Sequence, residues 1–149
     1  MKNHLIIGNP IAHSLSPKIH NYWFKEYNIE GNYEKISPNE SEIQSIVKKI
    51  KNNEIYGMNV TVPYKQTVIP FLETQSEIAK KTNSVNTIFN KDGKIHGDNT
   101  DVYGFEKSIT NNKINLEGKS ALIFGAGGVV PSIIIALLKL NIQKIFVSN

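Results

Sequence analysis

Short apolar runs and helically spaced apolar residues alternate along the first two thirds of the chain. Short segments with apolar or aromatic residues predict strands at 4–8, 32–36 and 56–60. Apolar residues three or four positions apart predict helices at 17–27, 38–50 and 64–72. This alternation is typical of an α/β fold, in which helices cover a mostly parallel sheet on both faces and give three layers.

The pattern changes toward the C-terminus. Two short segments, 85–90 and 94–97, flank a turn at 91–93, which predicts a β-hairpin, and a helix is expected over 101–110. The polar stretch 111–118 is expected to be a linker.

The last segment predicts one βαβ unit, with a strand at 119–125, a helix at 128–140 and a strand at 143–147. We therefore divide the chain into a first domain, residues 1–103, and the start of a Rossmann-type dinucleotide-binding domain, residues 104–149. One βαβ unit buries too little surface for a finished dinucleotide fold, so the second domain is expected to be truncated.

Composition narrows the possible functions. The chain has no cysteine, which excludes disulfides, thiolate metal sites and a cysteine nucleophile and favours a reducing cytoplasm. Its net charge is +4, and every basic residue is a lysine. Without arginine the chain lacks the usual bidentate reader of guanine, so we expect no nucleic-acid partner. We also expect no metal site.

Two apolar segments have some features of membrane or export signals. The run 5–7 is too short for the core of a signal peptide. Residues 121–138 are uncharged, but a Gly-Gly pair and Pro131 interrupt them and favour a buried strand followed by a buried helix. No membrane partner is expected.

Two serines lie between the first strand and the first helix. Ser14 and Ser16 stand where backbone N–H groups and the positive end of a helix converge, a favourable place for a carboxylate. Ser16 is equally a natural N-cap before Pro17, an alternative that Ser14 does not have. His13 is expected to pack within the loop.

A single lysine follows the third strand, in the segment 59–65 (NVTVPYK). Open α/β sheets bind ligands at the edge where this strand ends, and Pro63 turns the chain so that Lys65 is directed to that edge. A lysine there could polarise a carbonyl and move a proton. The alternative is a solvated lysine on a short helix.

The segment 97–104 (GDNTDVYG) places two carboxylates in one turn. Asp98 or Asp101 could cap the following helix. Alternatively, one of them could hold the ammonium of Lys65 and accept a hydrogen bond from a substrate hydroxyl. Spacing alone does not show that the lysine and an aspartate meet.

The segment 125–128 (GAGG) separates a predicted strand from a predicted helix. A tight glycine turn at this place lays a pyrophosphate on the N-terminus of the helix. The sequence therefore predicts a dinucleotide-dependent enzyme whose substrate domain comes first.

With these segments in view, the chain resembles the shikimate dehydrogenases. Four motifs of that family occur in order, at 8–17, 59–65, 85–87 and 98–101. The resemblance implies an NADP-dependent oxidoreductase that reversibly reduces 3-dehydroshikimate to shikimate in the biosynthesis of chorismate and the aromatic amino acids.

The resemblance also implies roles for individual residues. Lys65 and Asp101 would form the catalytic pair and contact the substrate. The rest of the substrate site would comprise Ser14, Ser16, Asn59, Thr61 and Asn86. The cofactor site would comprise Gly125, Ala126, Gly127, Gly128, Val129 and Asn149.

The chain departs from the family pattern at three places: Asn83-Ser84 replaces a usual Gly-Ala, Tyr64 replaces a common phenylalanine, and branched residues at 129–131 follow the glycine turn. We expect a slightly shifted strand after Ser84 and a Tyr64 hydroxyl that reaches water. We also expect looser helix packing and weaker cofactor binding after the turn.

Two alternatives remain beside this interpretation. One is a quinate/shikimate dehydrogenase that uses NAD or NADP, and the other is a non-catalytic ligand-binding fragment or paralogue. The expected partner is a small molecule, and the expected state is a monomer or a homodimer. Because the family's contacts to the adenine-side ribose and phosphate would come from beyond Asn149, residues 1–149 alone are expected to bind NADPH very weakly and to be inactive. Shikimate binding is expected to be weak, because a later glutamine and tyrosine of the family's substrate site are missing.

Overall fold

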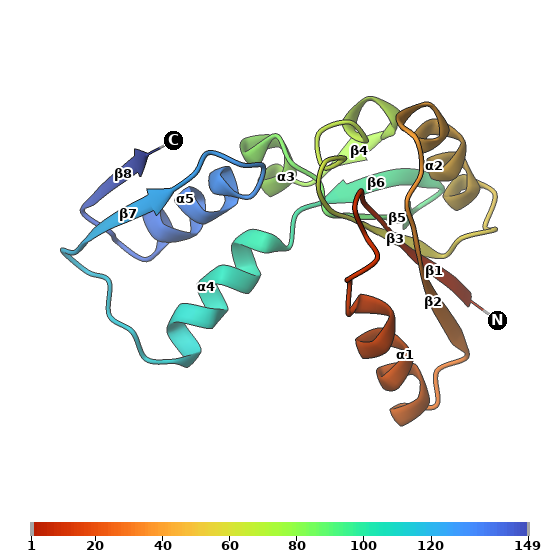
Figure 1. Ribbon diagram of the computed structural model, residues 1–149, viewed down its shortest axis with the longest axis horizontal. Coiled ribbons are helices and arrows are strands. Elements are labelled where there is room, and N and C mark those ends of the chain that lie inside the picture. The colour runs from red at the N-terminus through yellow and green to blue at the C-terminus, as the bar shows by residue number, and fades with distance from the viewer. Residues whose placement is uncertain (1, 149) are drawn as a thin grey trace.

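The fold contains two β-sheets of unequal size, with helices packed around them. The structure is a computed structural model that describes residues 2–148. One sheet has six strands and the other has two, and helix α4 (Asp101–Asn111) runs between them (Figure 1).

The six-stranded sheet has the order β2-β1-β3-β5-β6-β4. Its strands are β1 (Lys2–Ile7), β2 (Gly31–Ile36), β3 (Gly57–Val60), β4 (Thr74–Gln75), β5 (Thr87–Lys91) and β6 (Lys94–Asp98). Strand β1 is parallel to β2 and β3, and β4 is parallel to β6, whereas β5 is antiparallel to both of its neighbours. The prediction of a mixed α/β fold with a mostly parallel sheet is confirmed, and so is the hairpin.

Helices pack on both faces of this sheet. Helix α2 (Ile43–Lys51) buries its apolar side against one face, in a cluster that includes Ile7, Met58 and Ile88. Helix α1 (Ser16–Glu26) lies on the other face, where Phe24 packs against Ile6 and Tyr33 (Figure 1). The sheet and its two helical layers form the predicted three-layer arrangement.

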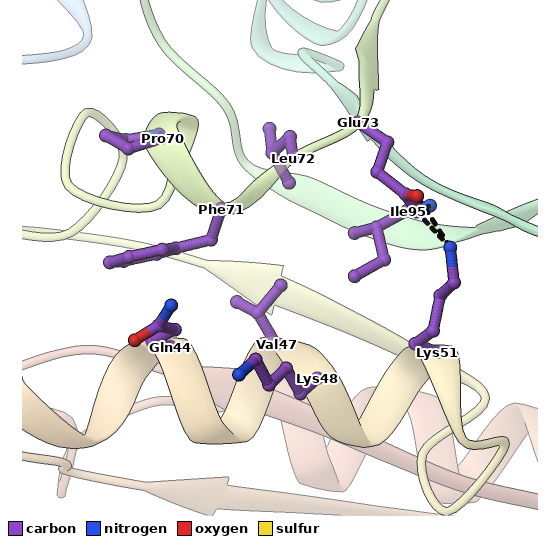
Figure 2. A pocket seen from close by; sticks show the side chains of 9 residues that line it. All are labelled: Gln44, Val47, Lys48, Lys51, Pro70, Phe71, Leu72, Glu73 and Ile95. Carbon is purple, nitrogen blue, oxygen red and sulfur yellow. Dashed lines mark hydrogen bonds and ion pairs between the residues drawn. The ribbon is translucent and has the colours of Figure 1, made fainter.

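A groove runs between α2 and the segment 70–73 (Figure 2). Val47 and Phe71 point into it from opposite sides, and Lys51 closes one end with an ion pair of 2.6 Å to Glu73. Hydrogen bonds from Lys51 and from the backbone of Ile95 lower the pKa of the Glu73 carboxyl. The ion pair is well exposed to solvent, so it contributes little to stability.

The starts of the first two helices differ from the prediction in detail. Ser16 is the first residue of α1 and not its N-cap, which is Leu15, and no side chain caps this helix. A short 3-10 helix, η1 (Glu40–Glu42), precedes α2 and is capped reciprocally by Asn39 and Glu42. Helix α2 ends at Lys51, one residue beyond the predicted end at 50, and Asn52 is its C-cap.

The predicted helix at 64–72 is wrong. The chain forms turns over 62–68 and then a 3-10 helix, η2 (Ile69–Phe71). Pro70 has no backbone N–H to donate and its ring clashes with the preceding turn, so an α-helix cannot continue through it. Strand β4 and helix α3 (Glu77–Thr82) follow and were not predicted, because both are too short for a periodic pattern.

Two of the unusual residues have clear structural roles. Tyr64 is only 5 % exposed and its hydroxyl donates to the carbonyl of Pro38 at 2.6 Å, so the expectation that it reaches water is wrong. Asn83 ends α3 in the left-handed conformation, with φ 46°. Glycine adopts this conformation freely and asparagine tolerates it, so Asn83 can end the helix where the family usually has glycine.

The smaller sheet confirms the predicted βαβ unit. Strand β7 (Ser120–Phe124) pairs in parallel with β8 (Lys144–Ser148), and helix α5 (Val130–Lys139) connects them. Helix α5 begins two residues later than expected and packs against α4, where Lys139 lies 3.5 Å from Glu106. Helix α4 runs through the predicted boundary at 103/104, which stays a prediction.

Within residues 2–148, no helix combines the length and the apolar character needed to cross a bilayer. The uncharged stretch 121–138 is divided between β7, the glycine turn and α5.

Replacing Tyr64 by phenylalanine should lower the free energy of unfolding by about 1 kcal/mol, because the buried Pro38 carbonyl loses its donor. Urea denaturation of the chain measures the change. Tyr27, which is 69 % exposed, provides the control, and Tyr27→Phe should have no effect. Equal stability of the Tyr64→Phe and unaltered proteins would show that the bond to Pro38 contributes nothing.

Candidate active site

An ion pair between Lys65 and Asp101 forms the centre of the site. Lys65 lies in the turns after β3, and Asp101 is the first residue of α4. Lys65 Nζ and Asp101 Oδ2 are 2.6 Å apart, and the side chains are 13 % and 23 % exposed. The structure thus brings together the two residues that the sequence analysis named as a catalytic pair but could not place in contact.

Asn86 fixes the other oxygen of the same carboxylate. Its Nδ2 donates to Asp101 Oδ1 at 2.9 Å and to Thr100 Oγ1 at 2.9 Å, and its Oδ1 accepts from the Thr100 N–H at 3.0 Å. Bonds of this kind to a carboxylate are stronger than bonds between neutral groups. Both oxygens of Asp101 therefore have defined partners, and the carboxylate has one orientation.

A pocket of about 440 Å³ brings together the three predicted hydroxyls of Ser14, Ser16 and Thr61. We call it the hydroxyl pocket, and its lining comprises Ile6, Asn9, Pro10, Ile11, His13, Ser14, Ser16, Thr61 and Val62. His13, expected to pack in the loop, is exposed at this pocket. Ser14 Oγ accepts from the Ser16 N–H at 3.3 Å, so Ser14 does have a local structural role, contrary to expectation.

Gly8 allows the end of β1 to approach Thr61 closely. A Cβ at position 8 would collide with Thr61 Cγ2 and would press on Ile11 and the carbonyl of Val62. The absence of a side chain at Gly8 therefore determines where Thr61 lies in the hydroxyl pocket.

A second, smaller pocket of about 240 Å³ joins the lysine to the glycine turn. We call it the junction pocket, and Val62, Pro63, Lys65, Gln66 and Gly128 line it. Val62 lines both pockets, so they are neighbours. A ligand bound along the two would contact the hydroxyls at one end and Lys65 at the other.

The glycine turn has the geometry of a pyrophosphate cradle. Gly125 follows β7 with φ 97°, a conformation that favours glycine, and its N–H donates to the Ser148 carbonyl at 2.6 Å. Within residues 2–148, and apart from the chain neighbours of each glycine, no atom lies within 4 Å of where a Cβ would stand at Gly125, Gly127 or Gly128, so the described residues leave the space above the turn open. The turn leads directly into α5, whose N-terminus favours an anion.

The residues after the turn agree only partly with expectation. Val129 is the N-cap of α5 and is 43 % exposed beside the turn. Val130 is buried at 9 % exposure, and looser packing of α5 on the neighbouring strand stays a prediction. Asn149, assigned to the cofactor site from the resemblance, lies outside the described residues. Weak cofactor binding stays a prediction.

Asn59 contacts the protein through both ends of its amide. Its Oδ1 accepts from the Tyr33 hydroxyl at 2.6 Å, and its Nδ2 donates to the Asn86 carbonyl and to Thr87 Oγ1, both at 3.2 Å. Burial raises the pKa of Tyr33, which keeps this hydroxyl protonated as a donor. Asn59 supports Asn86 within the sheet, and its contact with substrate stays a prediction.

Neither aspartate is the N-cap of α4, so the capping alternative is wrong. The N-cap is Thr100, and Asp98 Oδ1 accepts from the Ser76 hydroxyl at 2.5 Å and from the Asn99 N–H at 2.7 Å. The free N–H group of Asp101 is instead bound by Asn99 Oδ1 at 2.9 Å. The sequence analysis gave Asn99 no role, although an asparagine just before a helix is a known capping signal.

Among the described residues, no cluster of three or more histidine, aspartate or glutamate side chains could hold a metal ion.

Comparison with known sequences identifies relatives along the whole chain. Residues 6–88 match the family described as the shikimate dehydrogenase substrate binding domain. A shikimate dehydrogenase (NADP(+)) of Pelagibacter ubique strain HTCC1062 is 54 % identical over 148 residues, which cover 99 % of this chain and 56 % of the relative. The chain thus spans about half the length of the curated relatives it matches.

Solved structures agree with the sequence relatives. The crystal structure of shikimate dehydrogenase 1 from Peptoclostridium difficile has a TM-score of 0.92 at 34 % identity, covering 100 % of this chain and 57 % of that one. Shikimate 5-dehydrogenase from Thermus thermophilus, in complex with NADP(H) and shikimate, has a TM-score of 0.90 at 28 % identity, covering 100 % and 57 %. The chain therefore belongs to the shikimate dehydrogenase family.

Proposed function

We propose that residues 1–103 form the substrate-binding domain, and residues 104–149 the start of the NADP-binding domain, of an enzyme that reversibly reduces 3-dehydroshikimate to shikimate. One observation carries the proposal: Lys65, held by Asp101, lines the same pocket as Gly128 of the glycine turn. The names of the relatives support the choice of substrate and cofactor.

Lys65 supplies the proton in this reaction. Reduction turns a carbonyl oxygen into a hydroxyl, so a proton must reach that oxygen as negative charge develops on it. The ammonium of Lys65 stabilises the charge and donates the proton. Asp101 holds Nζ in place through Oδ2, while Asn86 prevents the carboxylate from turning.

The hydroxyl pocket binds the substrate carboxylate. Ser14, Ser16 and Thr61 are donors that a carboxylate can accept from without a guanidinium, which fits a chain with no arginine. The net charge of +4 favours the approach of an anionic substrate.

The glycine turn fits the pyrophosphate of NADP. The backbone of 125–129 and the N-terminus of α5 would hold it, because no side chain at the three glycines fills the space. NADP, when bound, supplies the hydride chemistry. Preference for NADP over NAD stays a prediction, as do a cytoplasmic location and a monomeric or homodimeric state.

Lys65→Ala should lower kcat by about a hundredfold or more with little change in KM, the range expected for loss of a general acid. We would measure it in a chimera in which this chain replaces the 148 aligned residues of the Pelagibacter ubique relative. Lys48→Ala, on the exposed side of α2, is the control and should retain full activity.

An unchanged kcat in the Lys65→Ala chimera would contradict the assignment of Lys65. A folded, unaltered chimera that does not oxidise shikimate would contradict the proposed function as a whole.

Ser14→Ala should weaken shikimate binding by about tenfold, the effect of losing one hydrogen bond to a charged group. Calorimetry on the chimera measures the affinity, and thermal melting measures the cost of losing the Ser16 N–H partner. Ser108, which donates to the Phe105 carbonyl on exposed α4, gives the matched control Ser108→Ala. Lost stability with unchanged affinity would make the role of Ser14 purely structural.

A further inference from the structure

Asn99 lies buried where the two sheets of the molecule meet. It is only 4 % exposed, in the connection between β6 and α4. Its Nδ2 lies 3.2 Å from Thr82 Oγ1, 3.0 Å from the Ser84 carbonyl and 3.0 Å from Ser132 Oγ, while Oδ1 accepts from the Asp101 N–H at 2.9 Å. One amide side chain therefore connects three segments: the end of α3 at 82–84, the start of α4 and the start of α5.

The first connection positions the acidic member of the ion pair. Asn99 Oδ1 binds the N–H groups of Asp101 and Val102, the latter at 3.4 Å, which fixes the first turn of α4. The Asp101 carboxylate extends from this turn toward Lys65 and Asn86. A shift of the turn would move the carboxylate with it.

The second connection positions the lysine. Asn99 Nδ2 binds the carbonyl of Ser84, and the next N–H in the chain, that of Val85, donates to the Lys65 carbonyl at 2.9 Å. The backbone of Lys65 is therefore held against the segment that Asn99 holds. Both members of the ion pair depend on the same amide.

The third connection crosses to the nucleotide-binding part. Ser132 is fully buried in the first turn of α5, immediately after the glycine turn. Its hydroxyl accepts from Asn99 at 3.0 Å. The start of α5 is thus held relative to the site of proton transfer by a hydrogen bond between two buried side chains.

We propose that Asn99 is a positioning residue, which aligns Lys65 with Asp101 and, through Ser132, holds the glycine turn in register with that pair. This inference rests on the proposed function for its catalytic readout. Asn99 touches none of the reacting atoms and acts only through these neighbours.

Three variants of the chimera distinguish the effects of the three connections that Asn99 makes. Asn99→Ala removes all of them, and Ser132→Ala removes only the bond to α5. Ser84→Ala is the matched control, because Ser84 Oγ is buried in the same cluster and has no hydrogen-bond partner within residues 2–148. Each variant is assayed for kcat, for KM toward shikimate and NADP, and for Tm.

Asn99→Ala should lower kcat/KM by about tenfold or more, since small misplacements of catalytic groups are costly. Ser132→Ala should lower kcat or raise KM for NADP by about fivefold while leaving KM for shikimate within about twofold. Ser84→Ala should match the unaltered chimera. If Ser132→Ala behaves like Ser84→Ala, and Asn99→Ala lowers only Tm, the proposal is wrong.

A double-mutant comparison and a hydrogen-exchange measurement test the positioning role of Asn99 beyond the assays of the three variants. In an Asp101→Asn background, adding Asn99→Ala should lower kcat/KM by clearly less than the tenfold expected in the unaltered chimera, because the part of the effect that passes through Asp101 is already lost; full additivity would contradict this. In the chain itself, hydrogen exchange at the Asp101 and Val102 amides should accelerate in Asn99→Ala but not in Ser84→Ala. Unchanged exchange would overturn the positioning role even if the chimera had no activity.

Discussion

The partial burial of the Lys65–Asp101 ion pair is the constraint on which the site depends. With side chains only 13 % and 23 % exposed, neither charge is fully solvated, so each needs a close partner and further hydrogen bonds. Asp101 obtains them from Lys65 and Asn86, and its backbone obtains one from Asn99. These bonds hold together the segment after β3, the residue before β5 and the segment after β6, at one end of the sheet. The site forms where these three segments meet.

Much of the fold follows from local patterns. Apolar residues at the end of β1 and in β3 are buried under helices and neighbouring strands, so the strand character of these segments is visible in the sequence. Strand β7 is equally apolar in sequence, but the expectation of a buried strand is wrong, because three of its five residues are exposed within residues 2–148. Parallel strands bring their carboxyl ends to one edge, which is why hydroxyl, amide and ammonium groups after different strands could be expected in one place. The hairpin was equally visible, since Asp92 and Gly93 both adopt positive φ in its turn.

The sequence-based predictions fail where distant residues or single atoms determine the local structure. Pro70 allows only a 3-10 turn, whereas the apolar spacing around it suggested an α-helix. The carbonyl of Pro38 receives the Tyr64 hydroxyl that was expected to meet water. Asn99 could not be assigned from sequence, because its importance comes from Ser84 and Ser132, whose proximity depends on the completed fold.

Gly8 shows how a residue outside the site can control the affinity of the site. The methyl and hydroxyl groups of Thr61 share one Cβ, and β-branched side chains have few allowed rotamers. A side chain at position 8 would push the methyl group, and the hydroxyl would have to turn away with it. Substitutions at Gly8 would therefore imitate the loss of a binding residue in a mutational scan, although glycine has no side chain with which to bind anything.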